Sequence, residues 1–412
     1  MDRRAKMDRL AAVASAFTPG APVGLLDMLA GRMDQLTDVV SAVSMRGQHV
    51  GLYGERGVGK TSLATVLAEY FSSPRLQADL QAGVVNCSSD DSFSSLWHNI
   101  FTELGIDLAD EYAALSPEGI RRQLQAQDKT TLIVIDELDR LEDPEALTAL
   151  SDTIKTLSDH AVDSTLVLVG VGRSIGELVG EHQSIVRALV QIEMPRMTRR
   201  ELAEILLKGC ERAEVTIKSD AVDRITTLSE GLPHYTHLLG LHAGQNAVRN
   251  DRSEITVSDV EAAIPKAVDR HTIQDAYQQA TRSARKDALF AQVLLACALA
   301  PKNQLGFFTS GSIRSPLAVI AEREIDIPAF SNHLSQFLEP ARGSVLHREG
   351  TSRRYFYRFT DPIFQPYVVL TGLRDGLITH DQLRELGQDD DADESEILIP
   401  GEYEPNGPQQ LF

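Results

Sequence analysis

The amino-acid sequence predicts an α/β domain built on a parallel sheet, followed by an all-α region and a last domain of three helices and a hairpin. Three observations lead to this fold class. A glycine-rich loop lies between a short apolar run and a helix-patterned segment. Further apolar runs alternate with helical stretches as far as about residue 194. From Thr198 the pattern is helical, until an alternating basic segment begins near residue 344.

The glycine-rich loop runs from Gly54 to Thr61 and reads GERGVGKT, which fits the pattern GxxxxGK[ST]. An apolar run precedes it and helix-patterned residues 62–71 follow, which is the context that a phosphate-binding loop (P-loop) requires. The glycines let backbone N–H groups point at phosphates. Lys60 is placed to reach the β- and γ-phosphates, and the Thr61 hydroxyl to bind Mg²⁺. The residues predicted to hold the nucleotide here are Gly54, Glu55, Arg56, Gly57, Val58, Gly59, Lys60, Thr61 and Ser62.

Four further apolar runs follow the loop and are separated by helical stretches. These runs span residues 83–87, 131–135, 165–171 and 190–194. Strands that alternate with helices predict a parallel sheet covered on both faces, because the crossover helices must bury its two sides. With the strand before the loop, five strands are expected in an ATP-binding core over residues 23–196.

An acidic pair, Asp136 and Glu137, directly follows the run from Thr131 to Ile135. A carboxylate at the carboxyl end of a buried strand near a phosphate loop is suited to holding Mg²⁺ and its waters, so we predict Asp136 as the metal carboxylate. Glu137 is predicted to orient and deprotonate the attacking water. The alternative is a strand that runs into an acidic turn by chance, which the upstream phosphate loop disfavours.

Two arginines of the core are further catalytic candidates. Arg173 follows the strand 165–171, where a γ-phosphate sensor would project; an ordinary loop arginine is the alternative. Arg187 comes just before the last strand, from where an arginine finger could reach a neighbouring subunit's nucleotide. A solvated helix charge is the alternative for Arg187.

Residues 197–266 are predicted to form a helical lid over the nucleotide. Thr198 to Glu201 reads as a capping box that opens the first amphipathic helix. Gly231-Leu232-Pro233 breaks the chain between two later helices, because proline lacks an N–H and fixes φ. Pro233 and His234 are expected to face the nucleotide, although a histidine satisfied by a helix N-terminus is an equal alternative.

A polar linker over residues 267–282 is expected to lead into a last domain over residues 283–385. Its three helices are followed by an alternating segment, 344–359, that reads as a two-stranded hairpin, and together they predict a winged helix. The basic residues around the hairpin are Arg342, Arg348, Arg353, Arg354 and Arg358. Basic hairpins with interleaved aromatics suit nucleic-acid backbones, so DNA contact through Arg348, Arg353 and Arg354 is one interpretation. A protein-docking module is the other.

Composition sets outer bounds on these interpretations. A chain of 412 residues is long enough for two or three domains, and a formal net charge of −19 argues against broad adhesion to nucleic acid or anionic membranes without excluding a local basic face. No apolar run approaches the ~18 residues of a membrane span, and three scattered cysteines predict reduced thiols, so a cytoplasmic protein is expected. Residues 1–22 are predicted to be a flexible arm and residues 386–412 an acidic disordered tail.

The order of these motifs resembles the AAA+ ATPases of the origin-recognition initiator type, over about residues 25–378. The resemblance implies ATP and Mg²⁺ as cofactors. Gly31-Arg32 resembles the adenine-side entry segment of that family, which adds Arg32 to the nucleotide-binding candidates; a plain helix N-terminus is the alternative. The break at Gly231–Pro233, with Arg173 at the first sensor, resembles instead the related STAND signalling ATPases. Arg173 and His234 replace an asparagine and an arginine of the initiators, so hydrolysis is predicted to be slow.

Three functions are compatible with this sequence. The first is an ATP-hydrolysing molecular switch in which the nucleotide controls the winged helix and assembly, as a homo-oligomer or with another protein. The second is a DNA-binding ATPase that resembles initiators or transposon target-selection ATPases. The third is a regulatory subunit that binds nucleotide without turnover and recruits an effector, for instance in phage defence.

Overall fold

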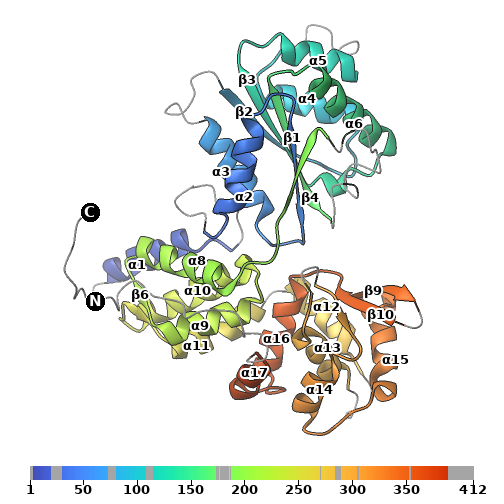
Figure 1. Cartoon of the computed structure of the whole chain (residues 1–412). Coiled ribbons are helices and arrows are strands. Elements are labelled where there is room, and N and C mark those ends of the chain that lie inside the picture. Colours follow the sequence, from blue (N-terminus) through green and yellow to red (C-terminus); the bar gives the residue numbers. More distant parts are fainter. Residues whose placement is uncertain are drawn as a thin grey trace, which may run out of the picture.

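The protein is described by a computed structural model in three parts: an α/β core, a helical lid and a C-terminal domain (Figure 1). The residues described are 3–19, 30–72, 80–107, 115–172, 176, 185, 187–269, 271–283, 289–303, 306–351 and 354–387.

The core is a five-stranded parallel sheet, as predicted. Its strands are β1 (His49–Gly54), β2 (Leu80–Asn86), β3 (Thr130–Asp136), β4 (Ser164–Val171) and β5 (Leu189–Glu193), in the order β2-β3-β4-β1-β5. Leu52 in β1 lies opposite Val169 in β4 and Ile192 in β5. The phosphate loop follows β1 and the acidic pair lies at the end of β3, with β4 between these two strands. Because the strands are parallel, the loop and the acidic pair lie at the same carboxyl edge of the sheet.

Helices cover both faces of the sheet, which is why its central strands are apolar throughout. The core helices are α2 (Met33–Val43), α3 (Lys60–Ser72), α4 (Phe93–Glu103), α5 (Pro117–Gln125) and α6 (Pro144–Asp159). In β3, Leu132 and Val134 pack with α2 and α3 in one cluster, whereas Ile133 and Ile135 pack with α4, α5 and α6 in another. Successive side chains of a strand point to opposite faces, so one apolar run supplies both cores.

The lid is helical, as predicted. Its helices are α8 (Arg199–Arg212), α9 (Ser219–Ser229), α10 (Pro233–Arg249) and α11 (Val257–Val268), with a short parallel pair, β6 (Thr216–Ile217) and β7 (Glu254–Ile255). The capping box is confirmed, since the Thr198 hydroxyl accepts from the Glu201 N–H and the Glu201 carboxylate accepts from the Thr198 N–H at 2.7 Å. Gly231, with φ of +76°, and Pro233 separate α9 from α10.

Two segments expected to be irregular contain helices. Most of the predicted flexible arm is α1 (Arg3–Ala16), which packs on α8 and α10, and most of the predicted polar linker is α12 (His271–Thr281). The reason lies in contacts with distant residues. Phe17 after α1 is 1% exposed and fills the space left by Gly209 and Gly240, where a Cβ would clash with its ring, and Tyr277 of α12 is also buried.

The C-terminal domain contains the predicted hairpin. Its elements are α13 (Phe290–Leu299), β8 (Phe308–Thr309), α14 (Arg314–Ala321), α15 (Ile327–Phe337), β9 (Leu346–Thr351) and β10 (Arg354–Phe359), followed by α16 (Phe364–Arg374) and α17 (His380–Gly387). The antiparallel sheet has the order β8-β10-β9. The helix α16, which the sequence did not predict, packs against α11 and α9 of the lid and so joins the two parts. The predicted acidic tail lies outside the described residues from 388 onward.

Among the helices that the structure describes, none combines the length and the apolarity needed to cross a membrane.

The packing of α1 on the lid predicts a large stability effect at Phe17. We expect Phe17→Ala to lower the free energy of unfolding by about 3–5 kcal/mol, because a buried aromatic ring is replaced by a cavity. Urea unfolding followed by circular dichroism measures this. Met7→Ala, at a position that is 61% exposed in the same helix, is the control and should leave the midpoint unchanged. Equal midpoints for both variants would mean that α1 contributes nothing to the lid.

Candidate functional site

The phosphate loop begins at the end of β1 and leads into α3. A Cβ at Gly54 would clash with the Met194 carbonyl, and Gly57 has a φ of +88°, so these two positions require glycine. The helix begins at Lys60, and the N–H groups of its first turn therefore face the loop. This arrangement suits an anion with several oxygens.

Lys60 is buried inside the loop. It is 7% exposed, and its Nζ donates to the carbonyl oxygens of Gly54 at 3.1 Å and Glu55 at 2.7 Å. Burial lowers the pKa of Lys60 to about 8, against the opposing attraction of Asp139, Asp136 and Glu55. The ammonium is thus still charged at neutral pH and is held at the loop by weak acceptors that a phosphate can replace.

Asp136 ends β3 beside Thr61. It is 3% exposed, its carboxylate is hydrogen-bonded to the Thr61 hydroxyl, and it accepts from the Glu137 N–H at 2.7 Å. Burial raises the pKa of Asp136, while the hydrogen bond from Thr61 opposes that change. A carboxylate and a hydroxyl oxygen side by side fit the hard oxygen ligands that Mg²⁺ prefers, so these two residues are suited to hold the ion.

Glu137 follows in a left-handed conformation, with φ of +54°, which turns the chain sharply at the end of β3. Its carboxylate is 48% exposed and accepts from Arg140 Nη1 at 2.8 Å. Arg140 belongs to the short 3₁₀ turn η2 (Leu138–Arg140) and was not predicted from the sequence. The same turn is fixed by Asp139, which accepts from the Val171 N–H at the end of β4 at 2.8 Å.

A cavity of about 790 Å³ joins these groups. The predicted residues that line it are Arg32, Glu55, Arg56, Gly57, Gly59, Lys60, Thr61, Ser62, Asp136, Glu137, Pro233 and His234. It also has walls that the sequence did not predict: Arg140 from η2, Thr18 and Pro19 after α1, and residues 358–362 of the C-terminal domain. All three parts of the chain therefore contribute to one cavity.

Comparison with known proteins places the core in a family. Residues 44–178 match the family model described as AAA domain. These residues form an AAA domain. The sequence is 26% identical over 268 residues to ORC1-type DNA replication protein 8 of Halobacterium salinarum, a match that covers 60% of this chain and 65% of that protein. The chain thus spans less than two thirds of its curated relative.

One solved structure shows a similar fold over most of this chain. The ORC2 protein of Aeropyrum pernix, solved in ADPNP-ADP complexes, superposes with a TM-score of 0.52 at 14% identity, over 92% of this chain and 98% of that one. Cdc6p of Pyrobaculum aerophilum gives a TM-score of 0.49 at 17% identity, over 89% and 99%. The predicted resemblance to AAA+ proteins of the origin-recognition type is confirmed, and the resemblance to STAND ATPases stays a prediction.

The remaining nucleotide candidates lie on the lid side of the AAA domain. Arg32 is 1% exposed and donates to the carbonyls of Val58, at 3.1 Å, and Pro195, at 2.7 Å. It thereby ties the phosphate loop to the segment between β5 and the lid, and burial lowers its pKa. The His234 ring lies 2.7 Å from the Pro19 carbonyl through Nδ1, so it also connects the lid to the segment after α1.

Other predicted residues do not meet in this cavity. Arg187 is exposed just before β5 and does not line it, and Arg173 lies outside the described residues. In the hairpin, Arg348 is exposed with its guanidinium 4.3 Å from the Tyr355 ring centre. Arg353 lies outside the described residues, and Arg354 is described only as the first residue of β10.

The lowered pKa of Lys60 predicts a pH-dependent nucleotide affinity. A phosphate binds the charged ammonium, so above pH 8 the loop must take up a proton on binding. We expect the affinity for MgATP to be level near pH 7 and to fall by up to about tenfold per unit well above pH 8. Titration calorimetry in two buffers of different ionisation heat measures both affinity and proton uptake. Lys155→Ala, at an exposed lysine of α6, should keep this profile, and absence of proton uptake at pH 9 would contradict it.

Proposed function

We propose that this chain is an ATP-binding and slowly ATP-hydrolysing switch. The observation that supports it best is the single cavity in which Lys60, Thr61, Asp136 and Glu137 meet residues of the lid and of the C-terminal domain. A phosphate loop and an acidic pair at one edge of a parallel sheet are the parts that phosphoryl transfer from ATP to water requires. Because the lid and the C-terminal domain each form part of the cavity wall, we propose that their positions depend on the ligand in the cavity.

Each residue has a chemical task in this proposal. The loop N–H groups and Lys60 bind the phosphates, while Thr61 and Asp136 hold Mg²⁺, which neutralises charge on the phosphate oxygens when bound. Glu137 takes a proton from the water that attacks the γ-phosphate. Its ion pair with Arg140 must loosen before it can do so, which favours slow turnover.

Assembly is part of the proposal. Arg187 is exposed before β5, where it is available to a neighbouring subunit or to a related ATPase, so we propose that the chain works as a homo-oligomer or in a hetero-complex. An arginine finger in trans can raise turnover about 10³-fold or more, which would make hydrolysis depend on assembly.

Two substitutions separate binding from turnover. Lys60→Ala should abolish MgATP binding, because the phosphates lose a buried cation, whereas Glu137→Gln should bind ATP and lose at least about 90% of turnover, because the glutamine cannot accept a proton. Equilibrium binding of a fluorescent ATP analogue and phosphate release measure the two steps. Glu142→Gln, at a nearby exposed position, is the control. Binding without turnover by the unmodified chain would favour the non-hydrolysing regulatory subunit instead.

DNA binding through the C-terminal hairpin is a second proposed function. Arg348 is exposed on β9, and the curated relative is named a DNA replication protein. The basic face is smaller than the sequence indicates. Arg342 lies 3.8 Å from the Phe290 ring centre and donates to the Ala280 carbonyl, and Arg358 lines the nucleotide cavity. Arg348, Arg353 and Arg354 remain as the candidates for phosphate contact.

The salt dependence of DNA binding tests this function. Each phosphate contact adds about 0.9 to the slope of log affinity against log salt, so three arginines predict a slope no steeper than about −3. Replacing Arg348, Arg353 and Arg354 with alanine should abolish binding in filter assays, whereas Arg314→Ala in α14 should not, since Arg314 already pairs with Asp326. If a chain ending at Gly387 binds DNA at low salt and the full-length chain does not, the acidic tail competes with DNA for these arginines. No binding by either would leave the hairpin as a protein-docking element.

A further inference from the structure

Arg358 is a cation of the C-terminal domain that lies in the nucleotide cavity. It is the fifth residue of β10 and lines the same cavity as Lys60 and Asp136. Its guanidinium lies 5.1 Å from the Phe307 ring centre, and within the part of the chain that the structure describes no carboxylate pairs with it. An arginine that shares a cavity with a phosphate loop and has no acidic partner is available to an anionic ligand.

Other arginines of the cavity differ from Arg358 because they have partners in the protein. Arg140 pairs with Glu137, Arg56 lies 4.0 Å from Asp361, and Arg32 donates to two backbone carbonyls. Their positive charges are therefore offset or occupied, whereas no carboxylate among the described residues offsets that of Arg358.

The segment after Arg358 rests directly on the phosphate loop. A Cβ at Gly57 would lie 3.2 Å from the Ile363 side chain, and the Tyr235 hydroxyl of the lid donates to the Ile363 carbonyl at 2.8 Å. The loop, the lid and the end of the hairpin are thus in contact within a few residues of Arg358. This contact places the end of β10 beside the phosphate loop.

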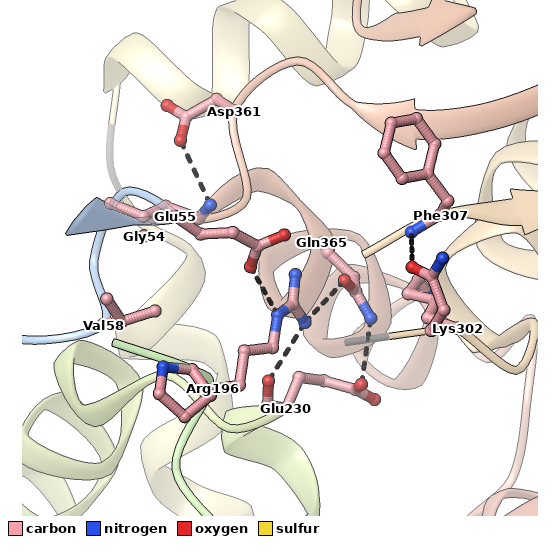
Figure 2. Close-up of polar contacts among 12 residues, drawn as sticks. Gly54, Glu55, Val58, Arg196, Glu230, Lys302, Phe307, Asp361 and Gln365 are labelled. Carbon is pink, nitrogen blue, oxygen red and sulfur yellow. Dashed lines mark hydrogen bonds and ion pairs between the residues drawn. The ribbon is translucent and has the colours of Figure 1, made fainter. Parts of the chain in front are cut away.

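Arg196, the last residue before the lid, connects the phosphate loop to the lid and to the C-terminal domain. Its Nε donates to the Glu55 carboxylate of the phosphate loop at 2.7 Å, and its Nη1 donates to Gln365 Oε1 of α16 at 2.9 Å and to the Glu230 carbonyl at 3.1 Å (Figure 2). One guanidinium therefore contacts all three parts of the chain. We call these four residues the Arg196 network.

The Arg196 network is completed by a buried amide. Gln365 is fully buried, and its Nε2 donates to the Glu230 carboxylate at 2.9 Å and to the Ala298 carbonyl of α13 at 3.0 Å. Figure 2 shows Gln365 beside the Arg196 guanidinium and the Glu230 carboxylate below Gln365. A buried polar group left without a partner is costly, so this network favours one position of the C-terminal domain over others.

We infer that Arg358 is a ligand of the β- or γ-phosphate of the bound nucleotide, supplied by the C-terminal domain of the same chain. The Arg196 network acts as the positioning element that keeps Arg358 in the cavity. This inference rests on the proposed ATP binding. It assigns to the hairpin a second cation for the outer phosphates, while His234 of the lid is already engaged with the segment after α1.

Nucleotide affinities of the full chain test the role of Arg358. Removing a charge-assisted hydrogen bond costs roughly tenfold or more in affinity, so Arg358→Ala should weaken MgATP binding by that factor and change AMP binding, measured by competition, less than about threefold. Arg358→Lys should recover part of the loss, because it restores the charge. Arg314→Ala removes an arginine of the same domain outside the cavity and should bind like the wild type. Equal thermal unfolding midpoints would show that all variants are folded.

A double-mutant cycle tests the positioning role of Arg196. If Arg196 acts through Arg358, Arg196→Gln should also weaken MgATP binding, and the effect of the double variant with Arg358→Ala should equal that of Arg358→Ala alone. Fully additive effects would overturn the positioning role.

The outcomes separate this inference from the proposed function. If the wild type binds MgATP and Lys60→Ala does not, the proposed function holds. If Arg358→Ala then binds MgATP as tightly as Arg314→Ala does, the inference about Arg358 alone is overturned. A wild type that binds no nucleotide would overturn the proposed function and the inference with it.

Discussion

The site depends on charge that is buried at the carboxyl edge of a parallel sheet. Asp136 is the last residue of β3, and Lys60 follows β1 at the end of the phosphate loop, with β4 between the two strands. Both side chains are nearly inaccessible to solvent. Burial disfavours both charged forms, as the lowered pKa of Lys60 and the raised pKa of Asp136 indicate. The protein compensates with carbonyls around the ammonium and with the Thr61 hydroxyl at the carboxylate. A triphosphate with Mg²⁺ supplies stronger partners to both groups, so ligand binding is favoured by the same burial that makes these charges costly.

The sequence was sufficient to predict the parts of this site that are local. The phosphate loop needs glycines and a following helix within a few residues, and Asp136 needs only an apolar strand before it, so both patterns are visible in short windows. The five strands were predictable because a strand buried on both faces appears in the sequence as a continuous apolar run. Their spatial order was not, since periodicity does not say that β4 lies between β1 and β3.

What the sequence did not predict depends on contacts between distant residues. Residues 3–16 look like an arm in the sequence, and only the space that Gly209 and Gly240 leave for the Phe17 ring explains why they form a packed helix. Arg358 reads as one of five hairpin arginines, and only the docking of the C-terminal domain separates it from Arg348 by placing it in the cavity. Arg196 and Gln365 form no motif at all, because they are 169 residues apart and meet through tertiary packing.

The same hairpin carries a candidate for nucleotide binding, Arg358, and a candidate for DNA contact, Arg348. In the β9–β10 register Arg348 pairs with Tyr357, the neighbour of Arg358, and its guanidinium stacks on Tyr355. Directly opposite residues of a hairpin share a face and successive residues alternate, so Arg348 and Arg358 lie on opposite faces. The face of Arg358 is thus directed to the nucleotide cavity, whereas the other face carries Tyr357 and Phe359 in the domain core and Arg348, which is exposed. A phosphate that moves Arg358 would move the strand, and with it Arg348 on the paired strand.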